Sequence, residues 1–216
     1  MDHDVTSRPL RSAIELDQAD PLAAVRQAFD LPHGVVYLDG NSLGPLPKAV
    51  PKAMAQVIER QWGASLIKSW NDHDWINLPS RVGEKIARLI GAGPGQVICT
   101  HSVSVNLFKV LAVALSLSAR PGKILSEADN FPGDLYLVEG MNTLLGAAAP
   151  AFEVVQTDAL LEHLDASVTI LLLTQVNFKT GAMHDLTALT ARAQAVGALI
   201  IWDLSHSTGV LELDVD

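Results

Sequence analysis

The sequence has little cysteine and few basic residues. Among 216 residues there is one cysteine, Cys99, so an intramolecular disulfide is excluded and a reducing compartment is favoured. We interpret Cys99, inside the apolar run QVICT, as a buried structural thiol. Lys and Arg number 15 against 24 Asp and Glu, for a net charge of −9. Because nucleic-acid binding needs a basic face, this balance argues against a nucleic-acid partner.

Long hydrophobic runs are also missing. Apolar stretches such as residues 110–115 are much shorter than the roughly 20 residues that cross a bilayer, so no membrane partner is expected. The N-terminal segment carries acidic residues and no apolar stretch typical of a secretory signal, which favours a cytoplasmic protein. The sequence contains no GxxxxGK[ST], GxSxG or HExxH motif, and we predict no metal site.

What is present is a regular exchange of short apolar runs with helical patterns. The sequence is 49% hydrophobic with a mean hydropathy of +0.25, enough for a large core. The pattern predicts an α/β fold with a mostly parallel sheet and helices on both faces. Helices are predicted over residues 13–31 (two pieces around Pro21), 48–63, 80–92, 101–117, 134–146, 158–164 and 186–197. Strands are predicted over residues 34–40, 95–100, 122–127, 151–157, 167–176 and 198–204.

Two further expectations concern packing and domains. The helix over residues 101–117 is apolar around its circumference, which predicts burial at the domain centre. The chain ends soon after an inner strand, where a closing helix and further strands are expected, so we predict that a C-terminal part is absent. We divide the chain into an N-terminal segment with a Gly/Pro-rich turn, residues 1–45, and an incomplete large α/β domain, residues 46–216.

Ligands of parallel sheets gather beyond the carboxyl ends of the strands. The first such end leads through Thr100 and His101 into the apolar helix, whose N-terminal N–H groups suit a phosphate. The alternative there is ordinary N-capping by Ser102 or Ser104. At the second, the turn FPGD presents Phe131 either to a flat ligand or to the core.

The other two strand ends carry more polar groups. Thr174, Gln175, Asn177 and Lys179 follow the third, where they either meet a ligand or only satisfy loop backbone groups. Asp203 follows four apolar residues at the fourth, where a buried carboxylate costs several kcal/mol unless a cation or strong donor meets it. His206 is one candidate for that partner, and a protonated ring nitrogen of a ligand is the other.

Five segments, YLDGNSLGPLPK, VSVNLFKVL, NFPGDLY, VNFKTGAMHD and IWDLSHSTG, resemble the motifs of the kynureninase family in that family's order. The last alone would fit many relatives of the aminotransferases, whereas five in order are specific, and the resemblance covers nearly the whole chain. It implies a fold-type I enzyme dependent on pyridoxal 5'-phosphate (PLP).

The resemblance also implies roles for individual residues. Val103 and Ser104 would hold the PLP phosphate, Phe131 would stack on the pyridine ring, and Asp203 would pair with the pyridinium nitrogen. The full cofactor-binding set is Val103, Ser104, Phe131, Pro132, Gly133, Asp134, Thr174, Asp203 and His206.

Three residues, Asn41, Ser42 and Trp70, are candidates for substrate contact. His73 receives no catalytic role. The family's Schiff-base lysine falls beyond residue 216, so the catalytic residue is not assigned.

The implied reaction is hydrolysis of L-kynurenine, with 3-hydroxykynurenine as a second candidate, to anthranilate or 3-hydroxyanthranilate and L-alanine in tryptophan catabolism. A homodimer is expected, and the 216 residues taken alone are expected to be inactive. One alternative is another fold-type I PLP enzyme, desulfurase-like or epimerase-like. The other is a truncated, non-catalytic homologue acting as a binding or dimerisation partner.

Overall fold

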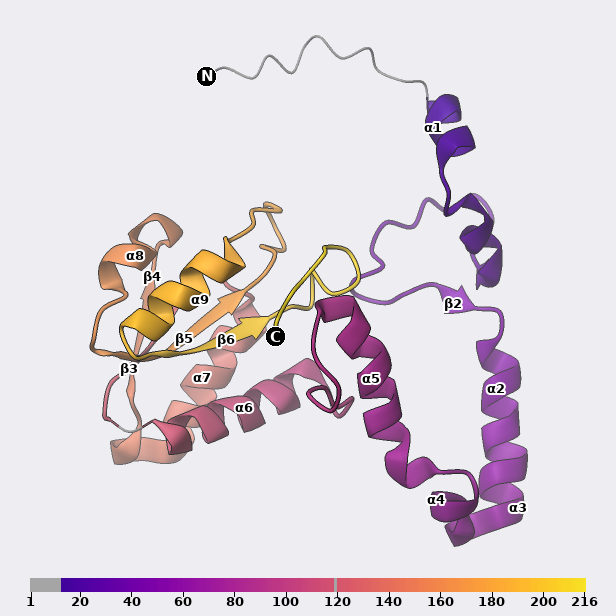
Figure 1. Ribbon diagram of the computed structural model, residues 1–216, viewed down its shortest axis with the longest axis horizontal. Coiled ribbons are helices and arrows are strands. Elements are labelled where there is room, and N and C mark those ends of the chain that lie inside the picture. Colours follow the sequence, from indigo (N-terminus) through magenta and orange to yellow (C-terminus); the bar gives the residue numbers. More distant parts are fainter. Residues whose placement is uncertain (1–12, 119) are drawn as a thin grey trace. The chain divides into compact units, whose positions relative to one another are not determined.

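The structure is a computed structural model that describes residues 13–118 and 120–216 (Figure 1). It contains two compact units, one ending at Trp75 and the other running from Ile76 to Asp216. The division expected at residue 45 stays a prediction. Within the described ranges, no helix is long and apolar enough to cross a membrane.

The first unit is a series of short helices. The two helical pieces around Pro21 and the longer helix near residues 48–63 are both confirmed. The bounds are α1 (Ala13–Ala19), η2 (Ala23–Ala28), α2 (Val50–Gln56), the π-helix η3 (Val57–Trp62), α3 (Gly63–Ser65), η4 (Leu66–Lys68) and α4 (Ser69–Asp72), and η5 (Trp75–Asn77) bridges to the second unit.

The strand predicted over residues 34–40 is wrong. That stretch has no strand in the structure, and Leu38 is 90% exposed. Instead β1 (Phe29–Asp30) pairs antiparallel with β2 (Leu46–Pro47). A strand needs a neighbour to pair with, and glycines and prolines on both sides of the short apolar run favour turns over a longer ladder.

The second unit is built on a parallel sheet. Its order is β4 (Ala151–Val155), β3 (Lys123–Glu127), β5 (Val168–Thr174) and β6 (Leu199–Asp203). All three neighbouring pairs are parallel, as predicted. Every residue of β5 is buried, because it has a strand on each side and helices on each face. All four carboxyl ends therefore lie at the same end of the sheet.

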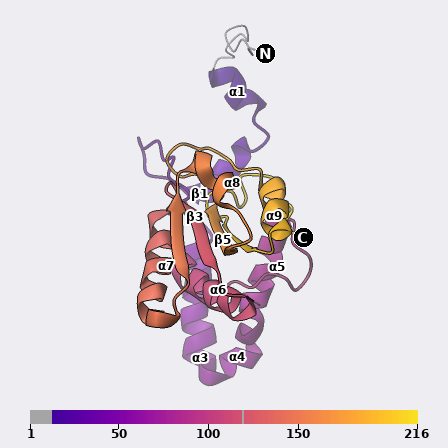
Figure 2. The same ribbon diagram turned by 90° about the vertical axis from the view of Figure 1, so that its left-hand side faces the viewer.

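Helices cover both faces of this sheet, and Figure 2 shows α7 and α9 on opposite sides of the strands. Alternate strand residues feed two apolar clusters: Leu171 packs in one with Leu189 of α9, and Ile170 in the other with Leu111 of α6. The fold class is confirmed. The helices and short 3-10 turns are α5 (Leu78–Ile90), α6 (Val103–Leu117), α7 (Pro132–Leu145), η6 (Gly146–Ala148), η7 (Thr157–Ala159), α8 (Leu160–His163) and α9 (Leu186–Ala195).

Three expectations near the start of α6 are wrong. Residues 95–100 form no strand, and the amide of Cys99 donates to the carbonyl of Pro79 instead of to a strand neighbour. Cys99 is exposed, not buried. Only one side of α6 is buried, since Val110 and Leu117 are 47% and 69% exposed. The physical reason is the same throughout: in the described part of the chain, no element covers these apolar groups.

Candidate functional site at the carboxyl ends of the strands

A buried polar network joins the carboxyl ends of β3 and β5. Asn130 is its centre: the carboxamide Oδ1 accepts the Phe131 N–H at 2.7 Å and the Thr174 hydroxyl in a short hydrogen bond. The Nδ2 group donates to the Ser126 hydroxyl at 2.8 Å. All three hydrogen-bonded side chains are almost fully buried. Asn130 was missed by the sequence analysis because an Asn before a Phe-Pro turn is typical of turns generally.

Two carboxylates meet beside this network. Asp134, in the first turn of α7, is 3% exposed, and the Thr174 hydroxyl lies 3.5 Å from its Oδ2. Burial raises the pKa of Asp134 to about 7, and the negative charge of Asp203 and a hydrogen bond with it act in the same direction. A hydrogen bond from Thr174 lowers the pKa and offsets part of this shift. Asp203 ends β6, and its Oδ1 accepts the N–H of Ser205 at 2.8 Å and the hydroxyl at 2.5 Å.

The two carboxylates at this site are hydrogen-bond acceptors that fit a cationic ring N–H. Two neighbouring carboxylates repel each other, and the cost falls when a positive charge or an N–H donor is placed against them. The pKa of Asp134 responds to the neighbouring Asp203 charge in the direction expected for such an uncompensated pair. The sequence-based inference that something positive faces Asp203 therefore agrees with the electrostatics of the site.

His206 lies on the aromatic side of the site. Its ring is 6.3 Å from Phe131 and stacks at 23° on Phe178, 6.4 Å away. Its Nδ1 atom is buried without a hydrogen-bond partner among the described residues. The contacts of Asp203 described above are with Ser205 and Asp134, so His206 as the partner of Asp203 is not supported.

Phe131 and Phe178 form an edge-to-face pair, with ring centroids 5.2 Å apart. Gly133 permits this position, because a Cβ there would lie 3.3 Å from Cε1 of the Phe131 ring. Pro132 starts α7 at a position where its missing N–H costs nothing. No sequence pattern marks Phe178, which lies in a Gly-containing loop and was not predicted.

The N-terminus of α6 has free hydrogen-bond donors. Ser102 precedes the helix in an extended conformation and makes no side-chain cap bond, so the capping alternative is wrong for Ser102. The first-turn N–H groups of a helix, here around Val103 and Ser104, have no partner within the helix. The Lys109 Nζ atom lies 3.0 Å from Nδ1 of His101 near this terminus.

A cavity of about 420 Å³ lies between this helix end and Asp203. Val103 and Asn106 line it from α6, and Ile201, Asp203 and Leu204 line it from β6 and the residue that follows. The structure thus brings a candidate phosphate site and a candidate ring-nitrogen site to the same hollow.

Of the polar residues after β5, two satisfy loop backbone groups. The Gln175 side chain bonds both the N–H and the carbonyl of His184, and the Asn177 Oδ1 accepts the amides at residues 179 and 180. Lys179 is exposed, with its Nζ 5.3 Å from the Phe178 ring centroid.

The candidate substrate residues belong to the first unit, whereas the candidate cofactor residues all belong to the second. Ser42 donates to Asp39 at 2.8 Å within the turn, and Trp70 packs edge-to-face on Trp75. The His73 ring meets the Ser65 hydroxyl at 2.9 Å. Substrate roles for Asn41, Ser42 and Trp70 stay predictions.

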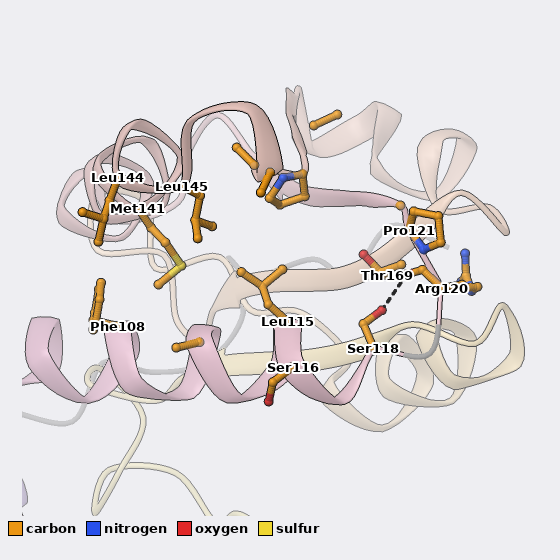
Figure 3. Close-up of a pocket in the computed structure, with 16 residues that line it drawn as sticks. Phe108, Leu115, Ser116, Ser118, Arg120, Pro121, Met141, Leu144, Leu145 and Thr169 are labelled. Atoms are coloured by element: carbon orange, nitrogen blue, oxygen red, sulfur yellow. Dashed lines mark hydrogen bonds between the residues drawn. The ribbon is translucent and has the colours of Figure 1, made fainter.

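A larger cavity, of about 720 Å³, lies at the amino ends of the strands (Figure 3). Leu115 of α6 and Met141 of α7 point toward one another across it. Arg120 lines it too, but its guanidinium donates to the carbonyls of Val168 and Val196. Such an apolar lining does not offer the acid-base groups found at the carboxyl ends. Within the described ranges, no group of three His, Cys, Asp or Glu residues is placed to hold a metal.

The sequence matches a known family model. Residues 36–216 match the family model aminotransferase class-V. A kynureninase of Pseudomonas fluorescens is 45% identical over 94% of this chain and 50% of its own length. A kynureninase of Deinococcus radiodurans is 47% identical over 93% of this chain and 49% of its own.

The fold is similar to that of solved PLP enzymes. A structure of a C-DES mutant with glycine covalently linked to the PLP cofactor aligns with a TM-score of 0.71 at 18% identity, covering 88% of this chain and 51% of that one. The chain therefore spans about half the length of the curated relatives and of this structure.

Proposed function

Since the chain belongs to the aminotransferase class-V family, we propose that the complete protein is a PLP-dependent kynureninase. It hydrolyses L-kynurenine to anthranilate and L-alanine. The second candidate substrate is 3-hydroxykynurenine, which would give 3-hydroxyanthranilate and L-alanine. Two kynureninases at 45% and 47% identity over nearly the whole chain support this proposal. The five ordered motifs of the sequence support it independently of the fold.

The observation that carries the proposal is the pair of carboxylates. Asp134 and Asp203 share a site in which the pKa of Asp134 is raised to about 7, a cost that a protonated pyridine nitrogen removes. Bound PLP supplies an electron sink for carbanion chemistry, and a carboxylate against its ring nitrogen favours the protonated form. Asp203 is the residue we assign to that contact, with Asp134 behind it.

The neighbouring residues supply the other contacts. The free N–H groups at Val103 and Ser104 bind the phosphate, as helix N-termini bind anions generally. The face of Phe131 would orient the ring, and Thr174, whose hydroxyl donates to Asn130, would lie on the side of the ring or its 3-oxygen. His206, whose Nδ1 is unpaired and buried among the described residues, bonds on the phosphate side.

Five further proposals rest on the resemblance and the composition. The Schiff-base lysine lies in the half of the relatives' length that this chain does not span. The protein is a cytoplasmic homodimer, and it acts in tryptophan catabolism. Asn41, Ser42 and Trp70 contact the amino-acid end or the ring of the substrate.

The test uses the complete protein with PLP. We expect a visible absorbance band from bound PLP and anthranilate fluorescence on addition of L-kynurenine, and parallel assays with 3-hydroxykynurenine rank the two substrates. Asp203→Asn abolishes most of the activity, while Asp158→Asn, at an exposed aspartate that follows the edge strand β4, leaves it unchanged. Bound PLP with sulfur release from L-cysteine and no anthranilate would favour the desulfurase-like alternative. No PLP band would favour the non-catalytic homologue.

A further inference from the structure

The loop between β5 and α9, residues 176–183, is closed at its base by one side chain. Gln175 donates from Nε2 to the His184 carbonyl at 3.0 Å and accepts the His184 N–H at 2.9 Å. These two bonds join the residue before the loop to the residue after it. In Figure 1 the loop runs between the ends of β5 and α9.

The closed base is tied to the neighbouring strand through a buried pair. His184 Nε2 lies 2.8 Å from Oε1 of Glu127, the last residue of β3. The two side chains are only 17% and 3% exposed. The other face of the pair is closed by Trp202, whose ring lies 6.1 Å from that of His184. We call Glu127 and His184 the anchoring pair of the loop.

This contact is one that the protein cannot lose cheaply. The second carboxylate oxygen of Glu127, Oε2, is buried with no hydrogen-bond partner among the described residues. The His184 ring therefore compensates a group that would otherwise be buried and unpaired, which is far more costly than an exposed one. The anchoring pair thus fixes the position from which the loop extends.

The loop carries Phe178 to the aromatic side of the site. The Phe178 ring meets Phe131 edge-to-face at 5.2 Å and stacks on the His206 ring at 6.4 Å. Phe131 is the residue whose ring face is assigned to the cofactor. Movement of the loop therefore reaches Phe131 through the Phe178 ring, beside the hydrogen bond that Asn177 Nδ2 donates to the Asp129 carbonyl at 3.2 Å.

We propose that Glu127 and His184 are positioning residues, which hold the loop so that Phe178 fixes the tilt of the Phe131 ring and hence of the cofactor. The cofactor part of this inference rests on the proposed function; the anchoring of the loop does not. Neither residue touches the candidate cofactor site, because Glu127 points to the face of the sheet opposite Ser126 and Thr174. Their effect reaches Phe131 through the loop, and His184 also contacts the ring of Trp202, the residue before Asp203.

The test compares four variants of the complete protein. His184→Leu removes the partner of Glu127, and His184→Gln restores an N–H donor. Phe178→Leu removes the intervening ring but leaves the anchor. The control is His163→Leu, from the part-buried His163–Glu153 pair at the edge strand β4, where the contact is 2.6 Å.

Two readouts separate the parts of the proposal. Hydrogen exchange of residues 176–183 in the cofactor-free protein reports the anchor; we expect about tenfold or faster exchange in His184→Leu, near-normal exchange in His184→Gln and no change in His163→Leu. The induced circular dichroism of bound PLP, divided by its absorbance, reports ring tilt; we expect a clear change in His184→Leu and in Phe178→Leu.

Unchanged loop exchange in His184→Leu, or an equal increase in His163→Leu, would overturn the anchor. Faster exchange with an unchanged dichroism ratio would overturn the link to the cofactor. If the unaltered protein shows no PLP band, the proposed function fails and the cofactor part fails with it, while the exchange result still decides the anchor. If His184→Leu does not fold, His184→Phe, which keeps a ring against Trp202 but cannot bond to Glu127, takes its place with the same expected and overturning results.

Discussion

The carboxylate pair makes a prediction about stability in the absence of cofactor. The folded-state pKa of Asp134 is about 7, above the ordinary value of 3.8. The folded protein therefore holds more protons than the unfolded chain between about pH 4 and pH 7. The free energy of unfolding should fall as the pH rises through this window, and the full cost should be present above it.

The size of the effect follows from the shift. A difference of about 3 pKa units corresponds to about 4 kcal/mol at pH 8. Burial is the largest cause of the shift and the Asp203 charge the second; because Asp203 is only half-buried, water screens part of the cost, and we expect about 2 kcal/mol. Asp134→Asn keeps the shape, removes the charge and places an amide beside Asp203. The variant should be about 2 kcal/mol more stable than the unaltered protein at pH 8 and close to it at pH 4.5.

Urea denaturation of the cofactor-free complete protein at the two pH values measures this difference. Asp158→Asn, at an exposed position, serves as the matched control and should give no pH-dependent difference. A variant Asp134→Asn that is less stable than the unaltered protein at pH 8, or that shows the same difference at both pH values, would refute the reasoning.

Three other substitutions test the packing and the network. Thr174→Val removes the hydroxyl that Asn130 accepts and should cost about 1–3 kcal/mol in urea unfolding; a neutral result would mean that the bond contributes nothing. Leu111→Ala, at a fully buried site, should cost about 2–5 kcal/mol, and a loss well under 1 kcal/mol would contradict the core assignment. Gly91→Ala should lower the melting temperature, since φ is +69° and a Cβ would lie 2.5 Å from the Leu213 carbonyl oxygen; an unchanged melting temperature argues against that conformation.

The central strands were predictable because their burial is written into local sequence. The apolar run of residues 169–174 is typical of a strand covered on both faces, and β5 is buried throughout. Residues 95–100 have a similar composition but form no strand. Pairing depends on neighbours in space, and the described chain supplies none there, which also leaves one side of α6 exposed.

The site was predictable in part for a similar reason. Asp203 could be found because a carboxylate directly after an apolar run is costly without a partner. Asn130 could not, because its contact with Thr174 spans 44 residues and depends on how β3 and β5 align. The position of Phe178 against Phe131 depends on the path of a loop that no periodic pattern describes.

The central claim is that Asp203 and Asp134 receive a protonated ring nitrogen. The direct measurement is the affinity of the complete protein for PLP and for its 1-deaza analogue, which has carbon in place of that nitrogen. We predict that the unaltered protein prefers PLP by about tenfold or more, and that Asp203→Asn removes most of the preference. Equal affinity of the unaltered protein for the two compounds would contradict the account.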